Sequence, residues 1–190
     1  MVICDYEPIT AWAARQQNKK TIGISHQYAF QYHIPRAGTD PVSEAVMRNF
    51  APVDIGIGLH WHHFDQPILP PVIETPIIAQ QIQRNKVVIY LPFEDQQQVM
   101  KLLSPFKEFE FFIYSPENVT SPYAHIHCKP LSLHGVQKDL SDCTGIICNA
   151  GFELASESLQ LGKKILVKPV HAQMEQTSNA AALQLLGYGK

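Results

Sequence analysis

The chain has 190 residues, of which 45% are hydrophobic, so it can bury the core of one domain or of two small ones. Its formal net charge of -2 gives no electrostatic reason to expect nucleic-acid binding. No apolar run approaches the roughly 18 residues of a membrane span, and no leader resembles a signal peptide. The four cysteines show no CxxC spacing, which favours reduced thiols in a cytoplasmic protein. A peripheral contact with the inner face of the membrane would need only a surface patch.

Strands and helices alternate from the first residues. In chain order we predict a strand over Val2–Cys4, a helix over Glu7–Gln17, a strand over Thr21–Ser25, a loop from His26 to His33, a helix over Val42–Asn49 after Pro41, and a strand over Val53–Leu59. The segment between Asp65 and Ile82 differs in composition, since it contains Pro67, Pro70, Pro71 and Pro76. Prolines suit an extended linker rather than the interior of a helix or strand. We place the domain boundary in this segment.

The pattern of strands and helices restarts at Lys86. We predict strands over Val87–Leu91, Glu110–Tyr114, Ala124–Lys129, Ile146–Cys148 and Ile165–Val167, and helices over Asp95–Leu103 and Gly135–Ser141, from Gly151 to Gly162, and after the polar loop that follows Val167. This alternation predicts an α/β fold with a parallel sheet. In such sheets, ligands bind at the carboxyl ends of the strands.

Three short anchors lie within the segment from Gly145 to Gly187. They are Asn149-Ala150-Gly151-Phe152, Ser156-Glu157, and Glu175-Gln176 with Asn179-Ala180. Their order and spacing resemble the nucleotide-sugar signature of GT-B glycosyltransferases. The likeness is greatest to the N-acetylglucosaminyltransferases of peptidoglycan lipid and lipopolysaccharide synthesis. It covers about forty residues and is more specific than a lone glycine motif.

The resemblance implies a domain organisation. Residues 86–190 would be the C-terminal domain, which binds the nucleotide-sugar on a Rossmann-like parallel sheet. Residues 1–80 resemble only the end portion of the N-terminal, acceptor-side Rossmann-like domain, followed by a linker. The family's glycine-rich loop and the base near its N-terminus have no counterpart here. We therefore expect either a fragment of a longer enzyme or a chain that needs a second polypeptide.

Gly151 leads the candidate binding residues. A turn of small residues before a helix presents backbone N–H groups and the positive end of the helix dipole, which together suit a diphosphate. Asn149 and Ala150 belong to the same turn. By resemblance, Glu157 accepts hydrogen bonds from the two ribose hydroxyls. Without the resemblance, Gly151 would read as an ordinary turn and Glu157 as an acid near a helix N-terminus.

The remaining donor contacts come from the resemblance. Glu175 and Gln176, in the loop after the next strand, would contact hydroxyls of the transferred sugar, and Asn179 would start the closing helix and order that loop. Backbone groups around Leu133 would recognise uracil. Phe152 would either pack near the nucleotide or face the core. Alternatively, Glu175, Gln176 and Asn179 form a solvated helix start.

Histidines form two candidate sites. His26 follows a buried strand on the acceptor side, and it could orient the acceptor or act as a base. His60, His62 and His63 occur in the sequence HWHH, and three imidazoles could hold zinc. Beyond Asp65, no nearby Cys, Asp or Glu has ligand-like spacing, so we favour a junction segment without a metal. The resemblance implies neither a metal nor another cofactor.

The expected function is transfer of N-acetylglucosamine from a UDP-sugar to a glycan or lipid-linked acceptor. Two alternatives stay open. The chain could be a non-catalytic UDP-sugar-binding subunit of a split glycosyltransferase, which would bind UDP without transfer. It could also be a UDP-sugar epimerase of the same architecture. The missing N-terminal half argues against an epimerase as much as against a complete transferase.

Overall fold

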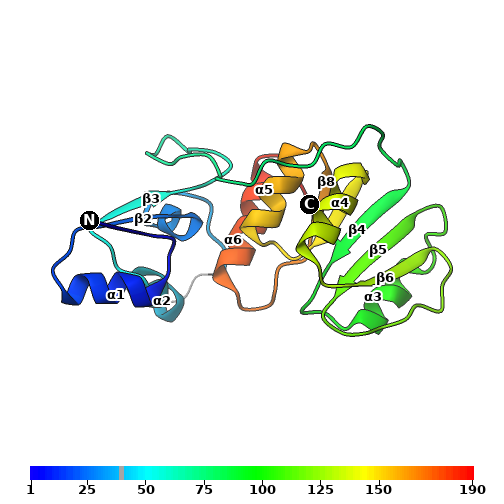
Figure 1. Cartoon of the computed structure of the whole chain (residues 1–190), viewed down its shortest axis with the longest axis horizontal. Coiled ribbons are helices and arrows are strands. Elements are labelled where there is room, and N and C mark those ends of the chain that lie inside the picture. Colours follow the sequence, from blue (N-terminus) through cyan, green and yellow to red (C-terminus); the bar gives the residue numbers. More distant parts are fainter. Residues whose placement is uncertain (39–40) are drawn as a thin grey trace. The chain divides into compact units, whose positions relative to one another are not determined.

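The computed structural model describes residues 1–38 and 41–190 (Figure 1). The chain divides into two compact units, Met1–Ile73 and Glu74–Lys190, and each contains its own parallel sheet. The division falls inside the proline-rich segment. The α/β fold class expected from the alternation of strands and helices is therefore confirmed. None of the helices in the described ranges is long and apolar enough to cross a membrane.

The first unit holds a three-stranded sheet in the order β1-β2-β3. Its elements are β1 (Val2–Cys4), α1 (Pro8–Gln16), β2 (Thr21–Ser25), the 3-10 helix η1 (His26–Gln31), α2 (Pro41–Asn49) and β3 (Ile55–Gly58). Glu7 caps α1, because its carboxylate accepts hydrogen bonds from the backbone N–H groups of Ile9 and Thr10. The loop expected from His26 is wrong, since residues 26–31 form η1 directly after β2.

The two faces of this sheet differ in composition. Gly23, Gly56 and Gly58 share one face, and η1 packs so closely on them that a Cβ at Gly58 would lie 2.6 Å from Cα of Ala29. Ile3, Ile22 and Ile55 are paired side by side and therefore share the opposite face. Ile3 is 61% exposed and Ile55 58% exposed. The glycines thus allow close packing on one face, while isoleucines on the other remain in contact with solvent.

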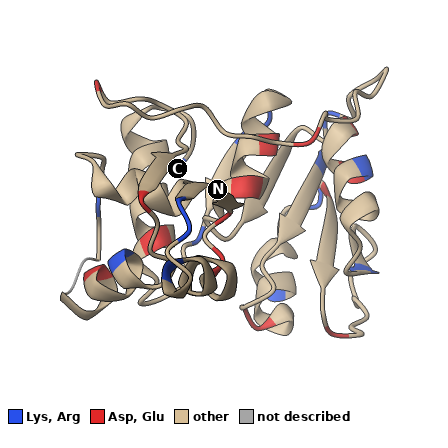
Figure 2. Ribbon diagram, turned by 60° about the vertical axis from the view of Figure 1, so that its left-hand side comes forward, with Lys and Arg blue, Asp and Glu red and all other residues tan. Residues whose placement is uncertain are grey.

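The second unit holds a five-stranded parallel sheet in the order β6-β5-β4-β7-β8. Its elements are β4 (Lys86–Tyr90), α3 (Gln96–Leu103), β5 (Glu110–Ser115), β6 (Ile126–Pro130), α4 (Leu133–Asp142), β7 (Gly145–Cys148), α5 (Phe152–Gln160), β8 (Lys164–Val167) and α6 (Met174–Leu185). Figure 2 shows acidic and basic residues distributed over the helices and loops of both units.

Both faces of the larger sheet are buried at its central strand, β4. Val88 and Ile89 are consecutive in β4 and point to opposite faces, yet neither is exposed to solvent. Val88 packs in a cluster with Leu140 of α4, and Ile89 packs in another with Val99 of α3. This burial explains why the strands read as nearly continuous apolar runs, which are typical of parallel sheets covered on both sides.

The order of the strands reverses beside β4. From β4 the chain proceeds outward to β5 and β6, then returns to β7 on the other side of β4 and continues to β8. The carboxyl ends of β4 and β7 therefore flank a topological switch point. In open α/β sheets this is where ligands bind. The residues that follow β4, β7 and β8 are consequently the first candidates for a site.

Candidate functional site

The turn after β7 leaves the start of α5 open. Gly151 is the N-cap of this helix, and no side-chain hydrogen bond caps it. A Cβ built at Gly151 would meet no atom of the described chain within 4 Å. Its φ of -68° is accessible to any residue, so backbone conformation does not require glycine here. The first turn of a helix presents N–H groups without intrahelical partners, so open space in front of it suits an anionic ligand.

Asn149 anchors this turn to the neighbouring strand. The side chain is buried, and its Nδ2 donates a hydrogen bond of 2.8 Å to the carbonyl oxygen of Lys168, directly after β8. Its Oδ1 has no hydrogen-bond partner among the described residues. Buried acceptors are rarely left unpaired, so this oxygen could accept a hydrogen bond from a ligand or a water molecule.

Gln96, after the adjacent strand β4, has the same property and was not identified from the sequence. Its Nε2 donates to the carbonyl oxygens of Leu91 and Glu94, at 2.8 and 2.7 Å. Its Oε1 is buried and unpaired within the part of the chain that the structure describes. Polar residues directly after the apolar strand were the only available signal. Gln96 and Asn149 thus follow the two strands that flank the switch point.

Asn179 holds α6 against the turn. It is fully buried, and its Nδ2 donates a 2.9 Å hydrogen bond to the carbonyl oxygen of Ala150. Ala150 is also fully buried, and Phe152 is 8% exposed. All three side chains are therefore buried. Backbone groups of this turn and the Asn149 side-chain oxygen are therefore its candidate contacts to a ligand.

Glu157 lies in the middle of α5, and its side chain is partly buried. Burial raises the pKa of its carboxyl group, and the nearby carboxylates of Glu153 and Glu74 raise it further. Its neighbour Ser156 donates a 2.6 Å hydrogen bond to the carbonyl oxygen of Phe152 within the helix. A partly buried carboxylate is suited to accept hydrogen bonds from hydroxyl groups.

Glu175 and Gln176 occupy a different local structure from the one expected. The loop placement is wrong, because α6 begins at Met174 and includes both residues in its first turn, while Asn179 lies a turn further on rather than at the helix start. Gln176 is buried, and its Oε1 accepts a 2.9 Å hydrogen bond from the N–H of Val170. Gln176 therefore shapes the loop between β8 and α6, whereas Glu175 is only partly buried.

Leu133 does not join this group. It is the first residue of α4 and is 72% exposed, directly after Ser132, whose Oγ accepts a hydrogen bond from the N–H of Gly135. In the strand order, β6 and β7 are separated by three strand spacings, or about 14 Å. The loop around Leu133 thus lies at the carboxyl ends of the strands, as the turn after β7 does. It follows the outermost strand β6, however, and not a strand at the switch point.

His26 lies at the carboxyl end of β2, in the first unit. It is 4% exposed, and its Nδ1 is 2.9 Å from the carbonyl oxygen of Leu59. Because a carbonyl oxygen only accepts, Nδ1 carries the proton of the neutral ring, and Nε2 has the lone pair. The ring packs against those of Phe30 and His60. This tautomer is the one that a general base acting through Nε2 requires.

A backbone hydrogen bond orients the ring of each histidine in the HWHH sequence. These histidines follow β3, which ends at Gly58. The Nδ1 atoms of His60, His62 and His63 accept hydrogen bonds of 2.8 to 2.9 Å from following backbone N–H groups. Burial, together with His26 and His62, lowers the pKa of His60 to about 3. Within residues 1–38 and 41–190, no three His, Cys, Asp or Glu side chains are placed to share a metal ion.

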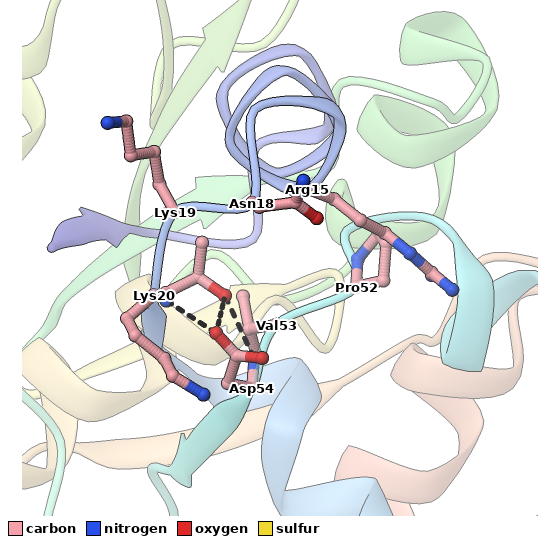
Figure 3. A pocket seen from close by; sticks show the side chains of 8 residues that line it. Arg15, Asn18, Lys19, Lys20, Pro52, Val53 and Asp54 are labelled. Atoms are coloured by element: carbon pink, nitrogen blue, oxygen red, sulfur yellow. Dashed lines mark hydrogen bonds between the residues drawn. The ribbon is translucent and has the colours of Figure 1, made fainter.

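A hollow of about 480 Å³ in the first unit is lined by Arg15, Lys19 and Lys20 (Figure 3). It lies at the amino ends of β2 and β3, where the carboxylate of Asp54 accepts a 2.8 Å hydrogen bond from the N–H of Thr21. Figure 3 shows Lys19 and Lys20 pointing in different directions. Because ligands of parallel sheets bind at the opposite, carboxyl ends, the turn after β7 is the better candidate.

Comparison with solved structures places this architecture among glycosyltransferases. SsfS6, a glycosyltransferase of Streptomyces sp. SF2575, is 12% identical with a TM-score of 0.61, over 99% of this chain and 55% of that one. The spinosyn rhamnosyltransferase SpnG, complexed with spinosyn aglycone, is 15% identical with a TM-score of 0.62, over 95% and 56%. MurG of Acinetobacter baumannii is 16% identical with a TM-score of 0.59, over 96% and 56%.

These similarities confirm the expected GT-B fold. The chain spans a little over half the length of each of these structures. No curated protein matches it. The sequence pattern of the family described as Glycosyl transferase family 1 matches residues 1–190. The chain therefore belongs to glycosyl transferase family 1.

Proposed function

We propose that the second unit binds a UDP-sugar, UDP-N-acetylglucosamine, for transfer to a glycan or lipid-linked acceptor. The observation that carries this proposal is the open, uncapped start of α5 at Gly151, beside the switch point of the sheet. The N–H groups of this turn would bind the diphosphate, and Glu157 would accept hydrogen bonds from the ribose hydroxyls. Glu175 and Gln176 would contact the sugar, and the loop around Leu133 the uracil.

In the proposed reaction, a hydroxyl oxygen of the acceptor attacks the anomeric carbon as the bond from that carbon to the UDP oxygen breaks. The hydroxyl proton passes to a base, and the negative charge goes to the departing diphosphate. The α5 N–H groups would stabilise that charge, because preorganised donors act most strongly where charge develops. Nε2 of His26 is the candidate for the base, as its tautomer allows.

A second candidate is a donor-binding subunit that does not transfer sugar by itself. The chain covers only 55% to 56% of the solved glycosyltransferases compared above. Residues that bind the acceptor could therefore reside in another polypeptide or in a longer form of this one. This candidate predicts UDP binding without transfer, whereas the first predicts both.

Calorimetric titration with UDP and with UDP-N-acetylglucosamine tests donor binding. We expect saturable binding that Glu157→Gln weakens about ten-fold or more, as for a hydrogen bond to a charged group. Glu153→Gln, four residues earlier on the same helix, is the matched control for loss of a carboxylate and should not weaken binding. Absence of binding of either ligand to folded protein would overturn the proposal.

A further inference from the structure

An ion pair lies across the carboxyl end of β7. Glu94 lies in the loop after β4, and Lys168 is the first residue after β8; Oε1 of Glu94 is 2.6 Å from Nζ of Lys168. Since β7 lies between β4 and β8, the two side chains meet across its carboxyl end. The turn that begins α5 leaves the sheet at that point. The pair therefore stands beside the open helix start rather than elsewhere on the surface.

The backbone of Lys168 is fixed against this turn, whereas its ammonium can exchange partners. Its N–H donates a 2.9 Å hydrogen bond to the carbonyl oxygen of Cys148, and its own carbonyl oxygen accepts the hydrogen bond from Asn149. The Lys168 side chain is 58% exposed and that of Glu94 21%. A partly exposed ion pair is weak. Exchange of the Glu94 carboxylate for a stronger anionic partner of the Lys168 ammonium therefore costs little free energy.

The surroundings of the turn are otherwise acidic. Glu153 lies in the first turn of α5, Glu157 one turn further, and Glu175 in the first turn of α6. Helix N–H groups contribute only partial charges, so a diphosphate here would benefit from a full positive charge. Phosphate oxygens also form stronger hydrogen bonds with an ammonium group than neutral acceptors do.

Resting on the proposed function, we propose that Lys168 binds the diphosphate of the nucleotide-sugar and that Glu94 holds its ammonium beside the turn until the donor arrives. On binding, the phosphate oxygens replace the Glu94 carboxylate as the partner of Lys168. Glu94 thus competes with the diphosphate for the Lys168 ammonium, and this competition lowers the affinity for the diphosphate. Lys168 is thus a phosphate ligand, and Glu94 is a positioning residue.

Titration of the wild type, Lys168→Met, Glu94→Gln and the double variant with UDP and uridine tests this assignment. We expect Lys168→Met to weaken UDP binding about ten- to a hundred-fold without changing uridine binding, because only UDP carries phosphate. Glu94→Gln should tighten UDP binding, and this gain should vanish in the double variant. Lys164→Met is the matched control, because Lys164 is the first residue of β8 and Lys168 follows the other end of that strand.

Each result decides the matter. If the wild type binds UDP and Lys168→Met behaves like Lys164→Met, the assignment of Lys168 is overturned while the proposed function stands. Equal weakening of UDP and uridine binding would also overturn it, since that pattern indicates a general structural role. Weaker UDP binding by Glu94→Gln would refute the proposal that the Glu94 carboxylate competes with the diphosphate for Lys168. If folded wild type binds neither ligand, the proposed function fails and this inference fails with it.

Discussion

The ammonium of Lys86 lies 2.9 Å from Oδ1 of Asp139 and so ties the first residue of β4 to α4 inside the second unit. Both side chains are more than nine-tenths buried. Lys129 and Tyr114 contact the other carboxylate oxygen at 2.5 and 2.6 Å, and Asp142 also pairs with Lys86. Burial by itself would lower the pKa of Lys86, but hydrogen bonds to Asp142 and Asp139 outweigh it and the pKa is raised.

Removing the lysine from this network should destabilise the second unit strongly. Lys86→Met leaves Asp139 buried with fewer donors, and breaking a buried ion pair in this way costs about 3 to 5 kcal/mol. Urea denaturation followed by circular dichroism measures the change. Lys101→Met on α3, at an exposed position, serves as the control and should change stability by less than about 0.5 kcal/mol. Similar stability of the two variants would contradict the prediction.

The same network should make the chain sensitive to acid. Burial raises the pKa of Asp139, but hydrogen bonds from Lys129, Tyr114 and Lys86 outweigh this effect, and the net pKa is lowered. A lowered pKa stabilises the fold above the unfolded-state value, about 3.9, and this contribution disappears as the pH falls through the folded-state value. Asp139→Asn should therefore be less stable than wild type at neutral pH but lose less additional stability below about pH 4. If the stabilities of the wild type and Asp139→Asn changed in parallel with pH, this prediction would be refuted.

The sequence was most informative where burial dictates residue type. The central strand β4 of the second unit is covered on both faces, so the run Val87–Leu91 could be assigned from hydrophobicity alone. It was least informative where local signals are missing. The start of α6 was misplaced because Gln173, its N-cap residue, makes no side-chain capping bond and is not among the usual capping residues.

The candidate site was partly predictable for a similar reason. The turn at Gly151 has a local signature, because small residues separate an apolar strand from a helix. The unpaired oxygen of Gln96 and the ion pair between Glu94 and Lys168 depend on which strands are neighbours. Strand order is a tertiary property, and the spacing of residues along the chain does not reveal it.

Glu157→Gln should separate binding from stability. Burial and the nearby carboxylates of Glu153 and Glu74 raise the Glu157 pKa, so ionisation of this group favours the unfolded state. The stability it contributes is present at low pH and is lost as the pH rises from its ordinary value of 4.5 through the raised one. We expect Glu157→Gln to melt at a higher temperature than wild type at neutral pH, while binding UDP more weakly. A lower melting temperature at neutral pH would contradict this.

Asn179 should act on the site through the backbone of the turn. Asn179→Ala removes the hydrogen bond to the carbonyl oxygen of Ala150 and leaves that buried oxygen short of a donor, which costs about 1 to 3 kcal/mol. Because this contact positions the start of α5, UDP affinity should fall along with stability. Leu183→Ala, at a fully buried apolar position of α6, is the control for loss of packing. Equal UDP affinity of the two variants would show that Asn179 does not position the turn.

Two glycine substitutions should have opposite consequences. At Gly58 a methyl group would lie 2.6 Å from Cα of Ala29, and this backbone neighbour cannot rotate away. Gly58→Ala should therefore destabilise the first unit by about 1 to 3 kcal/mol, as overpacking does. At Gly151 the same methyl meets no atom within 4 Å, so Gly151→Ala should cost no more than about 1 kcal/mol, the difference expected at an N-cap. Its methyl group would instead occupy the space in front of α5 and weaken UDP binding. Thermal melts and calorimetric titration of both variants measure the two effects, and a Gly151→Ala variant with wild-type UDP affinity would argue against a ligand at this helix start.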